Sequence, residues 1–229
     1  MNSLLNLILE AHGGMPRWNQ FNQMSARLTR GGMLWPLLGK MGMLDEVDIK
    51  INLHQAWAAH TPDGGVADSA VGAGVMPKEM VFARDALSGH QLNPSWSDAQ
   101  LNYFVGYAMW NYLSMPFLLS RPGFVLTKLT DWQENGQTWH RLSATFPPDI
   151  ATHSPVQTFY FSADGLLRRH DYEVEVAGGV PAAHYLSGHT TVQGITLPTR
   201  HMIYVRNAEL GDQPAPLMVS IGLSDIKLA

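Results

Sequence analysis

A chain of 229 residues is long enough to bury a substantial core and is typical of a single domain. Apolar residues make up 45% of it and charged residues only 15%, so the 12 Met and 7 Trp either fill a large core or line an apolar ligand pocket. The formal net charge of -4, without any Lys/Arg run, argues against nucleic acid as a partner, and the absence of Cys excludes disulfides, thiolate metal ligands and a Cys nucleophile.

Residues 1–22 are predicted to form an N-terminal helical segment. Ser3 can cap an apolar helix that begins there, and Gly13 and Gly14 end it. No basic residue precedes the apolar run and no small-residue cleavage site follows it, so the segment differs from a signal peptide. We therefore expect a cytoplasmic protein, or a periplasmic one if a signal peptide was removed from a longer precursor.

Two half-buried strands are expected next. Residues 24–29 alternate between apolar and polar side chains, and the same pattern returns at Val47 and runs toward Trp57. The side chains predicted to face inward are Met24, Ala26, Leu28, Val47, Ile49, Ile51 and Leu53. Residues 61–74 are rich in Gly, Ala and Asp and are expected to form a loop that could act as a mobile lid, before a further strand at residues 77–84.

A central helix is predicted at residues 97–119. Residues 101–120 contain no charged side chain, and this length alone would permit a membrane span. However, the segment includes Asn102, Asn111 and Pro116 as well as three Tyr, which lipid would tolerate poorly. We therefore expect a buried or pocket-facing helix without a transmembrane span, while contact with a membrane surface remains open. A helix that is apolar on nearly all sides must also be covered on nearly all sides, and the concave face of a curved sheet would do this.

The second half of the chain is predicted to consist of hairpins. Asn135–Gly136 and Asp164–Gly165 are turn signals between apolar runs. The expected strands span residues 125–132, 138–146, 159–162, 166–176, 184–192, 199–206 and 217–226. The fold class is therefore α+β, with residues 1–229 forming one domain, a curved antiparallel sheet whose concave face is covered by helices.

The last third of the chain resembles LolA-like lipoprotein-carrier domains in two segments, FYFSADGLLRRHDY at residues 159–172 and TTVQGITLPTRHMIY at residues 190–204. The whole chain is also similar to an uncharacterised bacterial family with an AHGG…RW opening, residues 11–18 here, and a GYAMWNYL helix, residues 106–113. The resemblance implies an open half-barrel whose concave face holds acyl chains or other apolar ligands. The N-terminal run does not match a signal peptide and the sequence has no Cys for lipid anchoring, so we do not expect a periplasmic lipoprotein-sorting role.

Familiar catalytic and metal-binding motifs are absent from the sequence. The 10 His show no recognised ligand spacing, so we expect neither a metal nor a cofactor. Alternation in residues 166–176 places Arg168, His170 and Tyr172 on the inner face, as ligand-binding candidates. The outer face, expected to be solvated, consists of Arg169, Asp171, Glu173 and Glu175. An inward Arg or His indicates either a wet cavity or a polar partner, and the simpler alternative for His170 is a satisfied structural histidine.

Catalytic candidates are His153, four residues after Asp149 in a Pro-rich loop, and His184, which follows a Gly-Gly turn. Further ligand-binding candidates come from a helical stripe and from two strand positions. They are Tyr107, Trp110, Asn111, Met115, Tyr185 and Arg200. A buried Asn111 amide would either orient a ligand carbonyl or bond a neighbouring strand.

Three functions remain open from the sequence. The first is binding of an apolar or amphipathic small molecule or lipid in the half-barrel. The second is a cofactor-free hydrolase, isomerase or lyase with His153 or His184 as general base, and the third is a protein-interaction domain. Converging ionisable groups in a cavity would favour the enzyme, and an apolar cavity would favour the binding domain.

Overall fold

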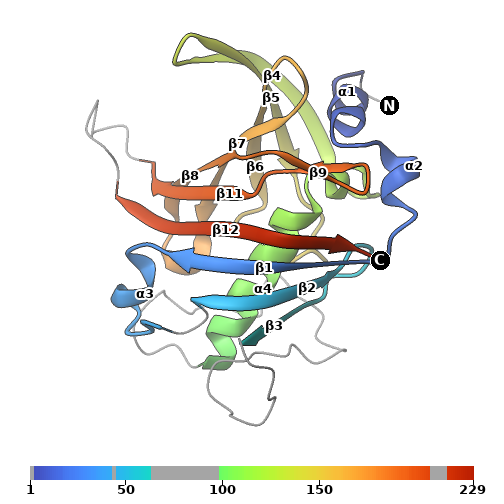
Figure 1. The fold of residues 1–229 in the computed structure, drawn as a ribbon. Coiled ribbons are helices and arrows are strands. Elements are labelled where there is room, and N and C mark those ends of the chain that lie inside the picture. The colour runs from blue at the N-terminus through green and yellow to red at the C-terminus, as the bar shows by residue number, and fades with distance from the viewer. Residues whose placement is uncertain (1–2, 43–44, 63–97, 207–215) are drawn as a thin grey trace.

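The computed structural model describes residues 3–42, 45–62, 98–206 and 216–229, and these form one large antiparallel sheet curved around a helix (Figure 1). The ten strands are β1 (Gln23–Gly31), β2 (Glu46–Asn52), β3 (Ala58–Pro62), β4 (Val125–Glu134), β5 (Gln137–Thr145), β6 (Val156–Phe161), β7 (Leu167–Val174), β8 (Val180–Ser187), β11 (Arg200–Val205) and β12 (Leu217–Leu228). Their order in the sheet is β3-β2-β1-β12-β11-β8-β7-β6-β5-β4. The predicted open half-barrel of the α+β class is confirmed.

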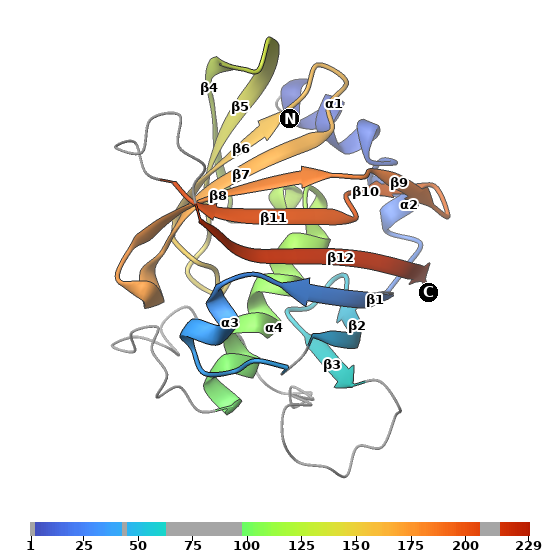
Figure 2. The same cartoon turned by 60° about the vertical axis from the view of Figure 1, so that its left-hand side comes forward.

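Helix α4 lies on the concave face of this sheet, and the shorter helices lie toward the ends of its strands (Figure 2). They are α1 (Ser3–Ala11), α2 (Met15–Trp18), α3 (Leu34–Leu37), α4 (Asp98–Ser114) and the 3-10 turns η1 (Phe117–Ser120) and η2 (Glu175–Ala177). A separate hairpin consists of β9 (Thr190–Val192) and β10 (Ile195–Leu197). The central helix was predicted to extend to residue 119, but α4 ends at Ser114. Pro116 lacks the N–H that would continue it, and the chain forms η1 instead.

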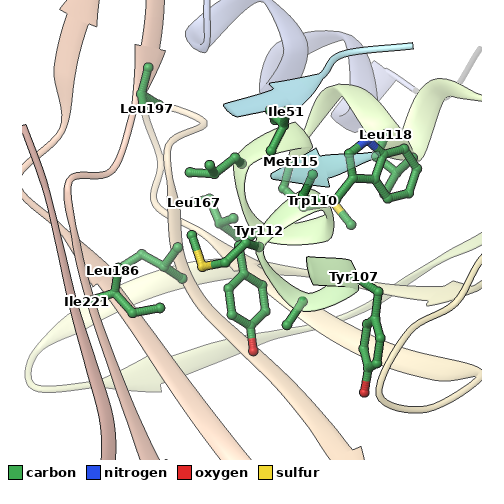
Figure 3. Packing of buried hydrophobic residues seen from close by; sticks show 14 of the residues in the cluster. Ile51, Tyr107, Trp110, Tyr112, Met115, Leu118, Leu167, Leu186, Leu197 and Ile221 are labelled. Atoms are coloured by element: carbon green, nitrogen blue, oxygen red, sulfur yellow. The ribbon is translucent and has the colours of Figure 1, made fainter. Parts of the chain in front are cut away.

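Helix α4 fills the concavity of the sheet, where the hydrophobic core lies (Figure 3). Its side chains from Leu101 to Ser114 are buried, with Asn102 only partly so. The Trp110 indole Nε1 donates a 2.8 Å hydrogen bond to the Asn52 carbonyl oxygen and so ties the helix to the end of β2. No helix within the described residues is long and apolar enough to cross a membrane.

Turn-forming residues determine where several strands end. In the β4–β5 hairpin, Asn135 and Gly136 both have positive φ, 50° and 73°, as the Asn-Gly signal predicts. The second strand ends at Asn52 instead of continuing toward Trp57, because the Asn52 Oδ1 accepts the backbone N–H of His54 and of Gln55 and closes a turn. The chain then returns as β3, which was not predicted from the sequence. The strand expected at residues 77–84 and most of the expected lid, residues 61–74, lie outside the described residues.

If the sheet depends on α4 for its core, truncating Trp110 should destabilise the whole domain. We expect Trp110→Ala to lower the free energy of unfolding by about 3–5 kcal/mol, since it empties a fully buried site. Trp110→Phe, which removes the bond to Asn52 and leaves a smaller void, should cost less, about 1–3 kcal/mol. Urea unfolding measures both. Val125→Ala, at a side chain that is 62% exposed, serves as the control and should change stability by less than about 0.5 kcal/mol.

Candidate functional site

A cavity of about 140 Å³ lies between α4 and the concave face of the sheet. One wall is a stripe of α4 at spacings of three and four residues, formed by Phe104, Val105, Ala108, Met109 and Tyr112. The opposite wall comes mainly from β1, β8, β11 and β12, with Leu28, Ala182, Ile203 and Ile221. Nearly all of these groups are apolar, and the small Ala108 and Ala182 leave the space that larger side chains would fill.

Tyr112, His153 and Tyr172 also line the cavity, and they form a hydrogen-bonded chain. The Tyr112 hydroxyl lies 2.8 Å from His153 Nε2 and 2.6 Å from the Tyr172 hydroxyl. The Tyr107 hydroxyl lies 3.1 Å from the other ring nitrogen, His153 Nδ1. Both nitrogens of His153 are therefore occupied by tyrosines, while Asp149, expected as a candidate orienting carboxylate, is exposed.

Three further histidines are buried in the core near these hydrogen-bonded side chains. His184 Nε2 lies 2.9 Å from His201 Nδ1, and His170 Nε2 contacts the Gln157 Oε1. Tyr112 packs edge-on against His184, with ring centroids 4.5 Å apart. None of the three is among the cavity-lining residues. The bonded His170 matches the alternative of a satisfied structural histidine, and Tyr172 is the inward candidate of β7 that reaches the cavity.

Burial dominates the titration of these groups. Removal from water lowers the pKa of His153 to about 3 and that of His201 to about 4. The pKa of His184 falls well below its usual value for the same reason, with neighbouring histidines adding to the effect. These rings are therefore neutral near pH 7. Within the described ranges, no group of three His, Asp or Glu side chains is placed to hold a metal ion.

The predicted helical stripe of Tyr107, Trp110, Asn111 and Met115 does not line the cavity. Trp110 and Met115 are buried, and the Asn111 Nδ2 donates to the Tyr107 carbonyl at 2.7 Å and to the Ala151 carbonyl at 2.9 Å. Asn111 thus bonds its own helix and a loop rather than a strand. Tyr107 does not line the cavity, but it contacts two residues that do, His153 through its hydroxyl and Phe104 through its ring.

Three other candidates lie away from the cavity. The Arg168 Nε donates to Ser162 Oγ at 2.9 Å, beside a register shift in β6–β7 that turns its side chain toward the β6–β7 hairpin. Tyr185 accepts a 2.8 Å hydrogen bond from Arg169 Nη1. Arg200, at the start of β11, is exposed.

The expectation of a solvated outer face was wrong for Arg169 and Asp171, whereas Glu173 and Glu175 are exposed as predicted. Arg169 is only 7% exposed and Asp171 only 4%. The Arg169 Nε donates to Asp171 Oδ1 at 2.7 Å, and Tyr160 donates to Asp171 Oδ2 at 2.9 Å. The rings of Trp132 and Tyr160 pack against the Arg169 guanidinium and shield it from solvent. Charge pairing and aromatic cover let these groups be buried on a face that the sequence pattern marks as polar.

One charged residue of the cavity, Arg30 at the end of β1, was not predicted from the sequence. Its side chain is 2% exposed, and its guanidinium carbon lies 3.3 Å from the ring centroid of Trp35. Among the described residues, Nε, Nη1 and Nη2 have no hydrogen-bond partner. A signal was present, because Arg30 has the same parity along the strand as the inward Ala26 and Leu28.

Comparison with known proteins finds similarity in structure. No protein-family model matches the chain, and no curated protein matches it. A LolA superfamily protein from Nitrosomonas europaea superposes with a TM-score of 0.53 at 10% identity, covering 99% of this chain and 92% of that one. The chain therefore has a LolA-like fold.

Two further solved structures are similar at lower scores. A DUF1329 family protein from Desulfovibrio piger has a TM-score of 0.45 at 11% identity, covering 99% of this chain and 92% of that one. A structure described as an outer membrane lipoprotein-sorting protein domain, from Vibrio parahaemolyticus, has a TM-score of 0.45 at 10% identity, covering 98% and 91%.

The buried histidines make stability depend on pH. Their pKa values are lower in the folded state than the 6.5 of an unfolded histidine, so the unfolded chain takes up more protons as the pH falls. We expect the free energy of unfolding to be greatest above about pH 6.5 and to fall between pH 6.5 and 4, by about 1.4 kcal/mol per pH unit for each such histidine.

Chemical unfolding at pH 7.5, 6.0 and 5.0 measures this slope. His60, whose pKa burial lowers to about 4, provides the comparison. The His60→Leu variant should lose about one histidine's share of the slope. Equal slopes in the variant and in the unsubstituted protein would show that His60 does not contribute.

Proposed function

We propose that this protein binds a small apolar or amphipathic molecule, with the apolar part of the ligand in the cavity between α4 and the sheet. The observation that carries the proposal is the cavity of about 140 Å³ with largely apolar walls. An engineered apolar cavity of roughly this size stays dry and takes up benzene. A ligand that fills the space supplies the dispersion contacts that the lining side chains lack.

The LolA-like fold is compatible with this role, and the sequence resemblance implies the ligand class, acyl chains or other apolar groups. The fold supplies a concave sheet face, and α4 leaves part of that face uncovered. Fold alone does not define a ligand, so the proposal rests on the cavity. A cytoplasmic location, or a periplasmic one after signal-peptide removal, stays a prediction.

The geometry favours binding over general-base catalysis. A base needs a ring nitrogen within reach of the substrate proton, but both nitrogens of His153 contact tyrosine hydroxyls. Burial also lowers the pKa of His153 to about 3, which makes it a weak base near neutral pH. His184, the other candidate, does not line the cavity.

Filling the cavity should abolish binding without unfolding the protein. We expect Ala182→Met, which places three further side-chain heavy atoms in the cavity wall, to remove the bound molecule and to stabilise the ligand-free protein by about 0.5–2 kcal/mol. Native mass spectrometry of protein purified without delipidation detects the ligand, and denaturing extraction identifies it.

The matched control is Ser187→Met, which adds the same side chain at the exposed end of β8. It should retain the ligand of the unsubstituted protein. Thermal unfolding reports whether both variants are folded. A folded Ala182→Met variant that binds as well as the control would place the ligand elsewhere.

A further inference from the structure

Arg30 is a charged group in a wall that is otherwise largely apolar. It lies on β1 beyond Leu28, on the inner face of the sheet, and both residues line the cavity. Its side chain is 2% exposed, so solvent does not compensate its charge. Burial lowers the pKa of Arg30 to about 9, which leaves the guanidinium protonated at pH 7. The cavity therefore contains a persistent positive charge.

The protein compensates this charge only in part. The Trp35 ring covers one face of the guanidinium, with the carbon 3.3 Å from the ring centroid. The Asp45 Oδ1 lies 3.9 Å from Nη2, beyond hydrogen-bond distance, and the Asp45 side chain is 53% exposed. All three guanidinium nitrogens are without a hydrogen-bond partner among the described residues. A buried cation in this state is strongly unfavourable until an anion pairs with it.

His60 adds a second unpaired polar atom to the same wall. It lines the cavity, is 1% exposed, and its Nε2 has no hydrogen-bond partner within the described part of the chain. Burial, together with the positive charge of Arg30, lowers its pKa to about 4, so the ring is neutral. A neutral imidazole can donate one hydrogen bond without adding charge.

We infer that Arg30 binds the anionic head group of an amphipathic ligand whose apolar part occupies the cavity. The inference rests on the proposed function and narrows its ligand to a monoanionic amphiphile, for which a medium-chain carboxylate is the simplest case. A carboxylate matches the planar guanidinium and accepts two parallel N–H···O bonds. One cation beside the Asp45 carboxylate suits a single negative charge better than two. Water could accept the same bonds, but it would leave the charge uncompensated.

Isothermal titration calorimetry of the delipidated full chain at pH 7.5 tests the inference with octanoate, octanol and acetate. These probes separate the contributions of tail and head group. We expect octanoate to bind about tenfold or more tightly than octanol, and acetate to bind far more weakly than either. In Arg30→Met, which keeps the stem but removes the charge, octanoate and octanol should bind within about twofold of each other.

The matched control is Arg27→Met, on the same strand but with its guanidinium directed to Glu46, at 3.1 Å, and away from the cavity lining. It should keep the preference for octanoate. Arg30→Lys, which retains the charge without the two parallel donors, should keep part of it. Because the probe comparison is made first in the unsubstituted protein, the inference is tested even if Arg30→Met does not fold.

The outcomes separate the inference from the proposed function. If the unsubstituted protein binds octanoate and octanol equally well, the proposed function stands and the role of Arg30 is overturned. Acetate binding as tightly as octanoate would overturn the amphiphile and leave a simple anion site. If no tailed probe binds, the proposed function fails, and the inference fails with it.

Discussion

Burial of α4 is the constraint on which the rest of the structure depends. The helix has 17 residues, about 26 Å of length, and carries no charge after its first residue. Such a helix exposes apolar surface on every side, so a flat sheet touching one face would leave much of it in water. The curved ten-stranded sheet solves this problem by wrapping around the helix (Figure 2). The half-barrel and its buried helix therefore require each other.

The two regions around α4 deal with their polar groups differently. Near His153, the hydroxyls of Tyr107, Tyr112 and Tyr172 bond to the ring or to one another, so these four side chains form a bonded polar group. The neighbouring His184 Nδ1 and His201 Nε2 have no hydrogen-bond partner among the described residues, but both rings are neutral. At Arg30, the covering ring of Trp35 supplies only partial compensation. The cavity extends between these regions, since its lining includes both Tyr112 and Arg30. The site thus has one preformed hydrogen-bonded region and one region with unmet bonding capacity.

Elements governed by local pattern could be predicted from the sequence. Alternation identified the inner face of β1 and β2, and the Asn135–Gly136 signal identified the β4–β5 hairpin. Strand β3 could not be predicted, because its existence depends on a turn closed by the Asn52 side chain. A helix that is apolar all around has no stripe to orient it, so its sequence cannot show that Ala108 faces the cavity while Asn111 faces the core.

The site was harder to predict because its features depend on distant partners. His153 is a plausible base in sequence, but its chemistry is decided by tyrosines more than forty residues away. Arg169 illustrates the opposite case, since Asp171 and the aromatic rings around it make burial tolerable on an apparently polar face. For Arg30, inward parity was visible, yet only the fold shows that no described carboxylate lies within hydrogen-bond distance.

The contrast between the two buried arginines connects stability to ligand binding. Arg169 is paired within the protein, so its contribution to stability does not depend on a second molecule. Arg30 has only the exposed Asp45 carboxylate at 3.9 Å and no hydrogen-bond partner among the described residues, so the ligand-free fold bears most of the desolvation penalty of its charge. An anion that binds there relieves a penalty that the unfolded chain never incurs, because an unfolded arginine is hydrated. The ligand-free protein is therefore less stable than it would be with a paired Arg30, and anion binding recovers this free energy. Occupancy of the cavity should for this reason raise the free energy of unfolding of the whole half-barrel.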